Sequence, residues 1–365
     1  MNFDFASSVP RLKRLLPRFR RLRMAVLGDA MLDRYVWGHA NRLSPEAAVP
    51  VVNYVSEQDL PGGACNVAAN IAALGSHVEA LGIVGGKRGQ KAGKILPDEA
   101  GAALQAALHK AGIGHRGIIP EKDRVTTLKT RIIARHQQIV RIDREDRNPI
   151  STQIEERLFR NLVATLKDFQ GLVVSDYDKG LLGAVFTDRA LHAAHELHVP
   201  VFVKPKTSGP SAYRGARLIV CNMKEAGNYV GRPLVEDKSI GEAGRTLLHQ
   251  FGCAAVVITR GEHGMSIFGE DSPHHLHIAA QSFDVTYARI GQPGIERGSE
   301  GRQVFDHTGA GDTVLSVLSL ALAAGADLPE AALLANTAAG VVVGKLGTAT
   351  VTPAELAGAL DEIKI

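Results

Sequence analysis

The chain has 365 residues, 45% of them hydrophobic and 22% charged, which is typical of a soluble globular protein with one large α/β domain or two ordinary ones. The net charge of +4 is too small to indicate a nucleic-acid partner, and no apolar stretch has the length of a membrane span. The three cysteines, Cys65, Cys221 and Cys253, are widely spaced and form no CxxC pair, so the sequence indicates neither a disulfide framework nor a zinc site. We therefore expect a cytoplasmic protein with no membrane partner.

The first 22 residues form a basic extension, and the stretch RLKRLLPRFRRLR (11–23) contains seven Lys and Arg side chains. A membrane-surface segment or the start of a signal peptide would also be basic. A signal peptide needs a long apolar segment next, however, and MAVLGD (24–29) is short and ends in an acid. We therefore expect a basic surface helix that breaks near Pro17 and leads into the first strand.

From residue 24 onward, short apolar runs alternate with stretches of helical periodicity. The runs expected to be strands are 24–28, 78–85, 171–176, 199–205, 216–222 and 254–261. The stretches expected to be helices are 65–75, 100–112, 152–166, 186–197 and 240–252. Each strand run is continuously apolar, as in parallel strands that are covered on both faces. The predicted fold class is α/β, with a doubly wound, mostly parallel sheet flanked by helices.

Two segments, 32–58 and roughly 116–147, alternate between apolar and polar residues with no helix between the alternating runs. This pattern is typical of an antiparallel sheet with one face in water. Because both segments lie inside the α/β succession, we expect them to form a small β lid beside the main sheet, within a single domain spanning residues 1–365. The exposed edge of such a lid favours pairing with a second copy, so we expect a homodimer through the lid.

A glycine-rich stretch, DHTGAGD (306–312), runs directly into an apolar helix expected from about Asp312. The first backbone N–H groups of a helix have no partner within it and carry partial positive charge, and glycines let an anion approach them closely. Gly309, Ala310 and Gly311 thus predict an anion hole. The Asp312 carboxylate at its edge suits a general base that removes a proton from a hydroxyl while the hole stabilises a transferring phosphoryl group. An ordinary helix N-cap is the alternative for Asp312.

Two other stretches place polar groups where open α/β sheets bind ligands. They contribute Gly62, Gly63 and Asn66 at the start of a helix, and Asp29 and Asp33 after the first strand. Such groups suit the hydroxyls of a small polar substrate, although each alone would be a turn or cap residue. A dehydrogenase interpretation of GIVGGKRG (82–89) fails because GxGxxG is not completed, and no GK[ST] P-loop occurs. Phosphates would therefore bind at the helix start near 309–312.

Together these features resemble one family, the ribokinase-like (PfkB) carbohydrate kinases, over nearly the whole chain, from about residue 22 to 362. The resemblance rests on the glycine pair with its Asn at 62–66, on DHTGAGD, and on NMKE (222–225), which is similar to the family's Asn-x-x-Glu element near magnesium and phosphate. It implies a kinase that uses ATP and Mg²⁺ to phosphorylate a small sugar or sugar phosphate.

The resemblance also implies roles for individual residues. Asp312 would activate the acceptor hydroxyl, and the backbone of Gly309 to Gly311 would hold the transferring phosphoryl group. Asn222 and Glu225 would organise magnesium through water, and Lys224 would meet a nucleotide phosphate. The residues expected to line the nucleotide pocket are Thr259, Gly261, Asn336 and Gly340. The residues expected to take sugar hydroxyls are Asp29, Asp33, Gly62, Gly63 and Asn66.

Several longer strings are similar to the subgroup of this family that phosphorylates the anomeric hydroxyl of heptose 7-phosphate for lipopolysaccharide core synthesis. They are GDAMLDRYVWGHANRLSPEAAVPVV (28–52), RHQQIVRID (135–143), SDYDKG (175–180), ITRGEHGM (258–265) and AAGVVVGKLGTATV (338–351). A phosphate on the substrate gives a role to a polar cluster, namely Lys129, Arg131, Arg135, Arg141, Asp176 and Lys179. A solvated basic strand face, and a structural ion pair between Asp176 and Lys179, are the alternatives.

The chain departs from the family pattern in several places. Lys204 stands where an acid is expected, His307 replaces a small β-branched or hydroxyl residue, and the 82–101 and 288–303 loops are long. The chain ends after a final expected helix and has no HxGH-type motif, so we expect no C-terminal nucleotidyltransferase domain. Two other functions stay open: a kinase of the same fold acting on another sugar, sugar phosphate or nucleoside, and a non-catalytic sugar- or nucleotide-binding regulator.

Overall fold

The computed structural model describes residues 5–89, 94–134, 137–206, 209–270, 275–280, 309–345 and 347–363. Within them, a ten-stranded main sheet has the order β14-β13-β12-β11-β10-β9-β1-β4-β5, with β6 also paired to β4. Its strands are β1 (Arg23–Gly28), β4 (His77–Arg88), β5 (Ile95–Pro97), β6 (Gly114–Lys122), β9 (Gly171–Ser175), β10 (Val201–Lys204), β11 (Leu218–Asn222), β12 (Ala255–Thr259), β13 (Met265–Gly269) and β14 (Leu276–Ile278). The pairings from β6 through β4 and β1 to β12 are parallel, and those of β5, β13 and β14 are antiparallel.

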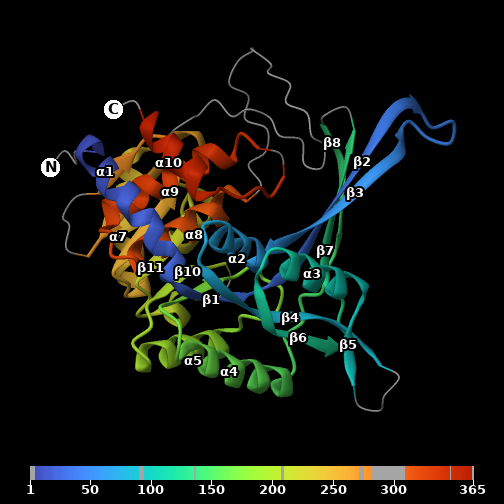
Figure 1. Ribbon diagram of the computed structural model, residues 1–365, viewed down its shortest axis with the longest axis horizontal. Helices are drawn as coiled ribbons and strands as arrows, with labels where there is room; N and C mark the ends of the chain where they lie inside the picture. The colour runs from blue at the N-terminus through green and yellow to red at the C-terminus, as the bar shows by residue number, and fades with distance from the viewer. Residues whose placement is uncertain are drawn as a thin grey trace.

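Helices cover both faces of this sheet, so the doubly wound α/β fold is confirmed (Figure 1). One face packs against α1 (Phe5–Leu15), α2 (Ala64–Ala73), α3 (Glu99–Lys110), α8 (Ala310–Ala323), α9 (Leu328–Val342) and α10 (Pro353–Asp361). The other packs against α4 (Thr152–Leu166), α5 (Ala184–Glu196), α6 (Met223–Val230) and α7 (Asp237–Phe251). Strand β1 shows why its sequence is continuously apolar: Met24 and Val26 pack in the first layer, and the alternate residues Ala25 and Leu27 pack in the second.

The strands and helices expected between residues 24 and 261 occur, with small shifts at their ends. The N-terminal basic stretch forms α1 and then a 3-10 helix (Leu16–Arg21) that includes Pro17 and leads into β1, as predicted. Its apolar side chains Leu12 and Phe19 are buried, which anchors the extension to the body. In the part of the chain that the structure covers, none of the helices combines the length and apolarity needed to cross a bilayer.

A second sheet of four strands, the lid, stands beside the main sheet (Figure 1). Its order is β3-β2-β7-β8, formed by β2 (Ala30–Leu43), β3 (Pro50–Gly63), β7 (Thr127–Ala134) and β8 (Gln137–Arg144). A single residue, Asp29, separates β1 from β2, and β3 runs directly into α2. The predicted lid is confirmed, and its longest hairpin is joined to the main body at both ends.

Two details of the predicted lid are wrong. Strands β2 and β7 pair in parallel, so the lid is a mixed sheet and not a purely antiparallel one. Residues 116–122 belong to β6, which pairs with β4 in the main sheet. Ile118 and Ile119 of β6 are buried in opposite helix layers, and this two-sided burial is typical of a main-sheet strand. The local alternation of polar residues obscured that burial in the sequence.

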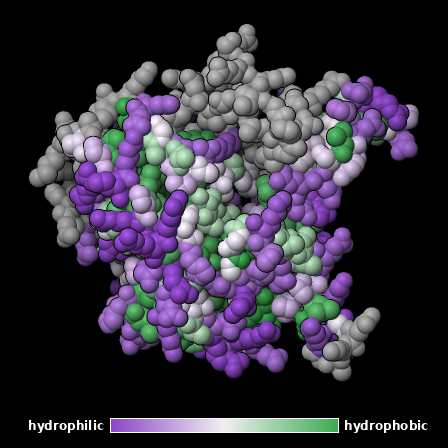
Figure 2. Space-filling model, viewed as in Figure 1, coloured by the Kyte–Doolittle hydropathy of each residue, from purple (hydrophilic) through white to green (hydrophobic). Residues whose placement is uncertain are grey.

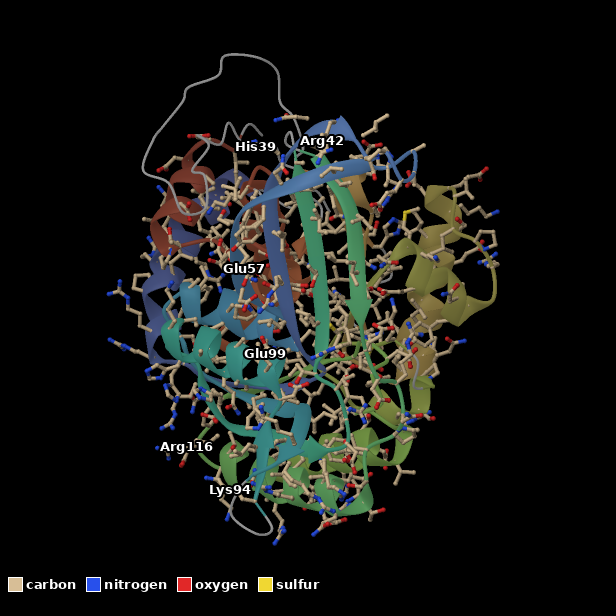
Figure 3. All side chains as sticks on the ribbon, turned by 90° about the vertical axis from the view of Figure 1, so that its right-hand side faces the viewer. His39, Arg42, Glu57, Lys94, Glu99 and Arg116 are labelled. Atoms are coloured by element: carbon tan, nitrogen blue, oxygen red, sulfur yellow. The ribbon has the colours of Figure 1, made fainter. Side chains whose placement is uncertain are left out.

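The outer half of the lid projects into solvent. Seen from outside (Figure 3), β7 and β8 run beside β2, and His39 and Arg42 mark the distal half of β2. Every residue of β8 is exposed, and the exposed positions of β2 and β3 gather toward their shared turn. The buried ends of β2 and β3 therefore lie against the body, where they meet the candidate site.

Candidate active site

The carboxyl ends of the central parallel strands meet at one edge of the main sheet. Strand β1 pairs with β4 on one side and with β9 on the other, which makes β1 the point where strand order reverses and where open α/β sheets bind ligands. A cavity of about 1120 Å³ lies at this edge, lined by strand ends, the lid and the start of α8. This volume exceeds that of an ordinary single-ligand pocket, so two small molecules can bind there side by side.

The glycine-rich stretch forms the amino end of α8 beside the cavity. Gly309 is the N-cap, with φ of 87°, and the helix begins at Ala310. A Cβ at Gly309 would lie 2.9 Å from Asn66 Nδ2, so this position requires glycine for both its conformation and its close contact. Gly309, Ala310 and Gly311 all line the cavity. The positive end of α8 therefore borders the cavity, as an anion hole requires.

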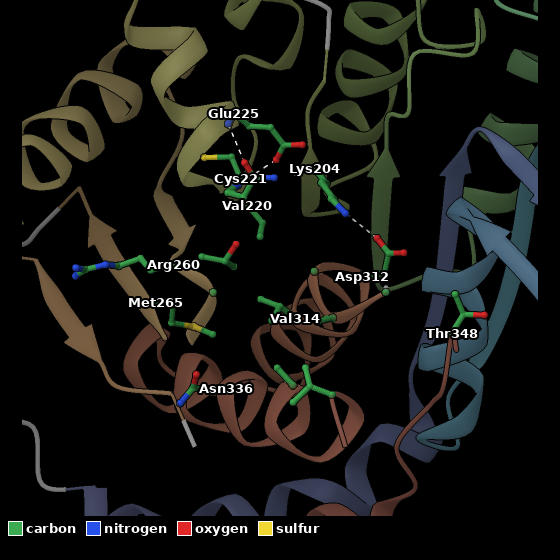
Figure 4. Close-up of a pocket in the computed structure, with 18 of the residues that line it drawn as sticks. Lys204, Val220, Cys221, Glu225, Arg260, Met265, Asp312, Val314, Asn336 and Thr348 are labelled. Atoms are coloured by element: carbon green, nitrogen blue, oxygen red, sulfur yellow. Dashed lines mark hydrogen bonds and ion pairs between the residues drawn. The ribbon is translucent and has the colours of Figure 1, made fainter. Parts of the chain in front are cut away.

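Asp312 follows these residues and is not the N-cap of α8, so the N-cap alternative is wrong. Its carboxylate lines the cavity, although the residue is only 5% exposed. Asn66 Nδ2 donates to Oδ2 at 2.9 Å from the start of α2. On Oδ1, Lys204 Nζ donates at 2.7 Å (Figure 4), and the Tyr177 hydroxyl donates as well. Donors from three separate elements thus fix the orientation of one carboxylate at the edge of the anion hole.

Tyr177 and Lys204 are site residues that the sequence analysis does not assign. Burial and the neighbouring Asp312 charge raise the pKa of the Tyr177 phenol, so its hydroxyl keeps its proton and can donate. Burial alone would lower the pKa of Lys204, but the Asp312 carboxylate raises it above its ordinary value, so the side chain is an ammonium. Tyr177 follows β9 and Lys204 ends β10. Their place just after apolar strand runs was the signal that could have identified them.

The lid side of the cavity is formed by the buried ends of the lid strands. Asp33 on β2 and Arg131 on β7 form an ion pair at 2.6 Å, and both line the cavity. Burial raises the pKa of Asp33 above its usual value in spite of the Arg131 guanidinium. A Cβ at Gly62 would come within 2.5 Å of Asp33 Oδ2, so glycine at this position makes room for the carboxylate. Gly63 also lines the cavity.

The predicted cation cluster divides into two groups. Lys129 and Arg141 line the cavity, and both bind Asp143, with N–O distances of 3.0 and 2.9 Å. Lys179 Nζ instead pairs with Glu145 Oε2 at 2.9 Å and does not line the cavity. Arg135 lies outside the described residues, as do His307 and the 288–303 loop.

Asp29 and Asp176 are buried beneath the cavity and do not line it. Asp29 Oδ2 accepts the backbone N–H of Tyr177 at 2.8 Å and of Lys179 at 3.3 Å, and burial raises the pKa of Asp29 to about 6. Asp176 accepts the hydroxyl of Tyr213 at 2.8 Å. These contacts give both acids a role in holding the loop after β9. The sequence analysis expects Asp29 to take sugar hydroxyls, and Asp176 to belong to the phosphate cluster or to pair with Lys179.

The opposite end of the cavity contains most of the predicted nucleotide residues. Those that line it are Asn222, Glu225, Thr259, Gly261, Asn336 and Gly340. Asn222 and Glu225 form a reciprocal capping box at the start of α6, and Lys206 Nζ pairs with Glu225 Oε1 at 2.8 Å. Glu225 and Asn336 face the cavity from opposite walls in Figure 4. Lys224 is exposed and does not line the cavity.

Comparisons with known proteins place the chain in a family. The model of the pfkB family carbohydrate kinases matches residues 22–355. The chain belongs to this family. Among curated pfkB relatives, a bifunctional protein HldE of Geobacter sulfurreducens is 44% identical over 335 residues, covering 92% of this chain and 62% of the relative. A bifunctional protein HldE of Pseudomonas putida is 40% identical over 351 residues, covering 96% of this chain and 66% of the relative. The chain thus spans slightly less than two thirds of the length of these relatives.

Two solved structures share the fold at low sequence identity. Phosphofructokinase-2 from Escherichia coli, in complex with substrates and products, is 17% identical with a TM-score of 0.69. Ribokinase from Arabidopsis thaliana, complexed with ribose and ATP, is 17% identical with a TM-score of 0.65. Each similarity covers 93% of this chain and 98% of the other. They establish the ribokinase-like architecture with its β lid.

Proposed function

We propose that the chain phosphorylates the anomeric hydroxyl of D-glycero-β-D-manno-heptose 7-phosphate with ATP, giving the 1,7-bisphosphate for ADP-heptose and lipopolysaccharide core synthesis. Family membership supports the reaction class. The strings at 28–52, 135–143, 175–180, 258–265 and 338–351, together with identities of 40–44% to the bifunctional protein HldE, support the substrate. Both substrates are cytoplasmic metabolites, so we infer that the chain acts in the cytoplasm.

The observation that carries the proposal is the buried Asp312 carboxylate at the edge of the α8 anion hole. A carboxylate in this position accepts the proton of the sugar hydroxyl as that oxygen attacks the γ-phosphorus of ATP. The backbone N–H groups at the start of α8 would stabilise the charge on the transferring group. Asn66 and Tyr177 hold the carboxylate by hydrogen bonds, so the base is oriented before the substrates bind.

The sugar phosphate would bind between the lid and Asp312. The Asp33–Arg131 pair offers an acceptor and donors for hydroxyl groups next to the base. Arg141 is the most exposed of the cavity cations, with 48% of its side chain exposed, and Lys129 lies beside it on Asp143. Lys129 is also 3.7 Å from Glu145, which pairs with Lys179, so three cations face the two carboxylates Asp143 and Glu145. The cluster retains a net positive charge, which favours a phosphate on the substrate. We infer that Lys129 and Arg141 meet the 7-phosphate.

Mg²⁺ fits the nucleotide end of the cavity through water. Asn222 and Glu225 supply oxygen atoms, but Glu225 already accepts from Lys206 and from the Asn222 backbone N–H. In the described ranges no three His, Cys, Asp or Glu side chains gather into a direct metal cage. Magnesium in kinases keeps several waters and binds mainly to nucleotide phosphates, which suits this donor set. When bound, the ion would neutralise phosphate charge.

The test is an ADP-release assay with ATP, Mg²⁺ and a panel of acceptors. The panel contains the β- and α-anomers of heptose 7-phosphate, ribose, fructose 1-phosphate and a nucleoside. We expect the β-anomer of heptose 7-phosphate to have the highest kcat/KM, and a new anomeric phosphate to be visible by phosphorus NMR. Phosphorylation of ribose with no turnover of heptose 7-phosphate would refute the substrate. Absence of turnover with every acceptor would favour a binding regulator.

We also infer that the chain forms a homodimer through the lid. Of the nine large hydrophobic side chains that are exposed in the described ranges, seven lie in the lid: Leu43, Val49, Tyr54, Val55, Ile139, Val140 and Ile142. Figure 2 shows one small hydrophobic area on the projecting hairpin, whose visible surface is otherwise mostly hydrophilic. We expect Ile142→Lys to shift the mass measured by light scattering from dimer to monomer. Val185→Lys, on α5 and also exposed to solvent, is the control.

A further inference from the structure

The ammonium of Lys204 lies between two acids at the point where the two ends of the cavity meet. Lys204 is the last residue of β10 and lines the cavity, with 18% of its side chain exposed. Its Nζ is 2.7 Å from Asp312 Oδ1, and the Glu225 charge acts on it from the nucleotide side. In Figure 4 the side chain extends from β10 toward Asp312, with Glu225 on the neighbouring helix α6.

The same ammonium lies over the amino end of α8. A Cβ built on Gly311 would be 3.3 Å from Lys204 Nζ, so the cation stands directly above the anion hole. The amino end of a helix carries partial positive charge and therefore repels a cation. In the protein without nucleotide, Asp312 compensates for this repulsion. A phosphoryl group on the α8 amides would compensate more strongly, since it brings more negative charge and three acceptor oxygens.

The contact with Lys204 also occupies one of the two oxygens of the base, Oδ1. A carboxylate oxygen offers about two lone pairs, and Oδ1 already accepts from both Tyr177 and Lys204. Oδ2 accepts from Asn66. A sugar hydroxyl that donates to Oδ1 must therefore displace one of these donors. The Tyr177 phenol is neutral and is not drawn to a phosphate by charge. The Lys204 ammonium is positively charged and is attracted to it.

We propose that Lys204 is a catalytic cation that moves its contact from Asp312 to the γ-phosphoryl group when ATP binds. This rests on the proposed phosphoryl transfer, not on the identity of the sugar. The move frees Oδ1 to receive the hydroxyl proton. The bond from the sugar oxygen to the γ-phosphorus forms, the bond from that phosphorus to the bridging oxygen breaks, and ADP leaves with the electron pair. Lys204 stabilises the negative charge on the transferring oxygens during this step.

The first test compares Lys204→Met, Lys204→Arg and Lys345→Met. Lys345 is the matched control because its side chain is 22% exposed and pairs with Glu355 at 2.7 Å, outside the cavity. We expect Lys204→Met to lower kcat about 10²-fold, and Lys204→Arg to retain at least about a tenth of it, since the charge is kept. Lys345→Met should leave kcat within about twofold. Wild-type kcat in Lys204→Met would overturn the proposal.

The second test needs no sugar and separates this role from a structural one. Only ATP carries the γ-phosphoryl group, so calorimetry with a non-hydrolysable ATP analogue and with ADP isolates the new contact. We expect Lys204→Met to lower the affinity for the analogue about 10-fold or more, and the affinity for ADP by less than about twofold. Equal effects on both nucleotides, or none, would overturn the proposal. The wild-type protein could fail to phosphorylate heptose 7-phosphate while Lys204→Met still loses affinity for the analogue and not for ADP. In that case the substrate assignment fails and the role of Lys204 stands.

Discussion

The start of α8 and the inner end of the lid border the same cavity but are built in different ways. At α8, three consecutive residues, Gly309 to Gly311, present the end of one helix to the cavity. At the lid, four side chains come from β2 and from the consecutive strands β7 and β8, which follow much later in the sequence: Asp33, Lys129, Arg131 and Arg141. Each lid side chain is already ion-paired with another residue.

The difference shows which kinds of site tolerate change. The anion hole depends on backbone conformation, so a single added methyl group would disturb it. The lid site depends on the balance of charges among several side chains, so loss of one cation leaves the others in place. We therefore expect large effects at α8 and graded effects at the lid.

The largest effect should come from Asp312→Asn, which tests the base at the α8 end. An amide cannot accept the hydroxyl proton, so kcat should fall by about 10²–10⁴-fold, while ATP affinity stays within a few-fold because the side chain moves a proton and does not bind the nucleotide. Steady-state kinetics and nucleotide calorimetry measure the two quantities. Comparable turnover in the variant would remove Asp312 from the base role.

A smaller loss should follow from Gly309→Ala. The residue has φ of 87°, and its new Cβ would press on Asn66 Nδ2, so we expect a destabilisation of about 1–2 kcal/mol and a fall in kcat of about tenfold. Gly325→Ala is the matched control, because Gly325 follows the other end of α8 with φ of 94° and has no atom near its added Cβ. Chemical denaturation should show similar losses for both variants, with kcat lowered only in Gly309→Ala.

Arg141→Ala probes the lid. We expect the KM for the sugar phosphate to rise by about tenfold and the KM for ATP to change less than about twofold, since the lost charge lies at the sugar end. Arg144→Ala on the same strand is the control, because its side chain is equally exposed but pairs with Asp98 away from the cavity. Equal increases in both KM values for Arg141→Ala would show that the lid cations do not form the phosphate site.

The smallest effect concerns Asp29, beneath the sugar end. Burial raises its pKa from 3.8 to about 6, so the folded protein holds this proton more tightly than the unfolded chain does. The associated stability is present below about pH 4 and is lost as the pH rises through 6. Asp29→Asn should flatten the fall in the free energy of unfolding across this window by up to about 1 kcal/mol per pH unit. Urea denaturation at several pH values measures it, and an unchanged slope would contradict the assignment.

The same contrast explains how much the sequence could predict. The anion hole and Asp312 were predictable because the glycines and the acid are neighbours in one stretch, and the main sheet was predictable because its strands are continuously apolar. The ion pairs of Lys129 and Lys179 were not, since their partners Asp143 and Glu145 are matched only by strand register and loop packing. The place of β6 in the main sheet was not predictable either, because its alternating polar residues are typical of a half-exposed strand.

The junction between β3 and α2 has a mechanical consequence. The lid strand ends at Gly63 and the helix begins at Ala64, so no spacer separates the lid from the first turn of α2, which contains Asn66. Asn66 donates a hydrogen bond to Asp312 on α8, and the rest of α8 is buried in the core. A tilt of the lid would therefore move Asn66 relative to Asp312, which links the position of the lid to the orientation of this carboxylate.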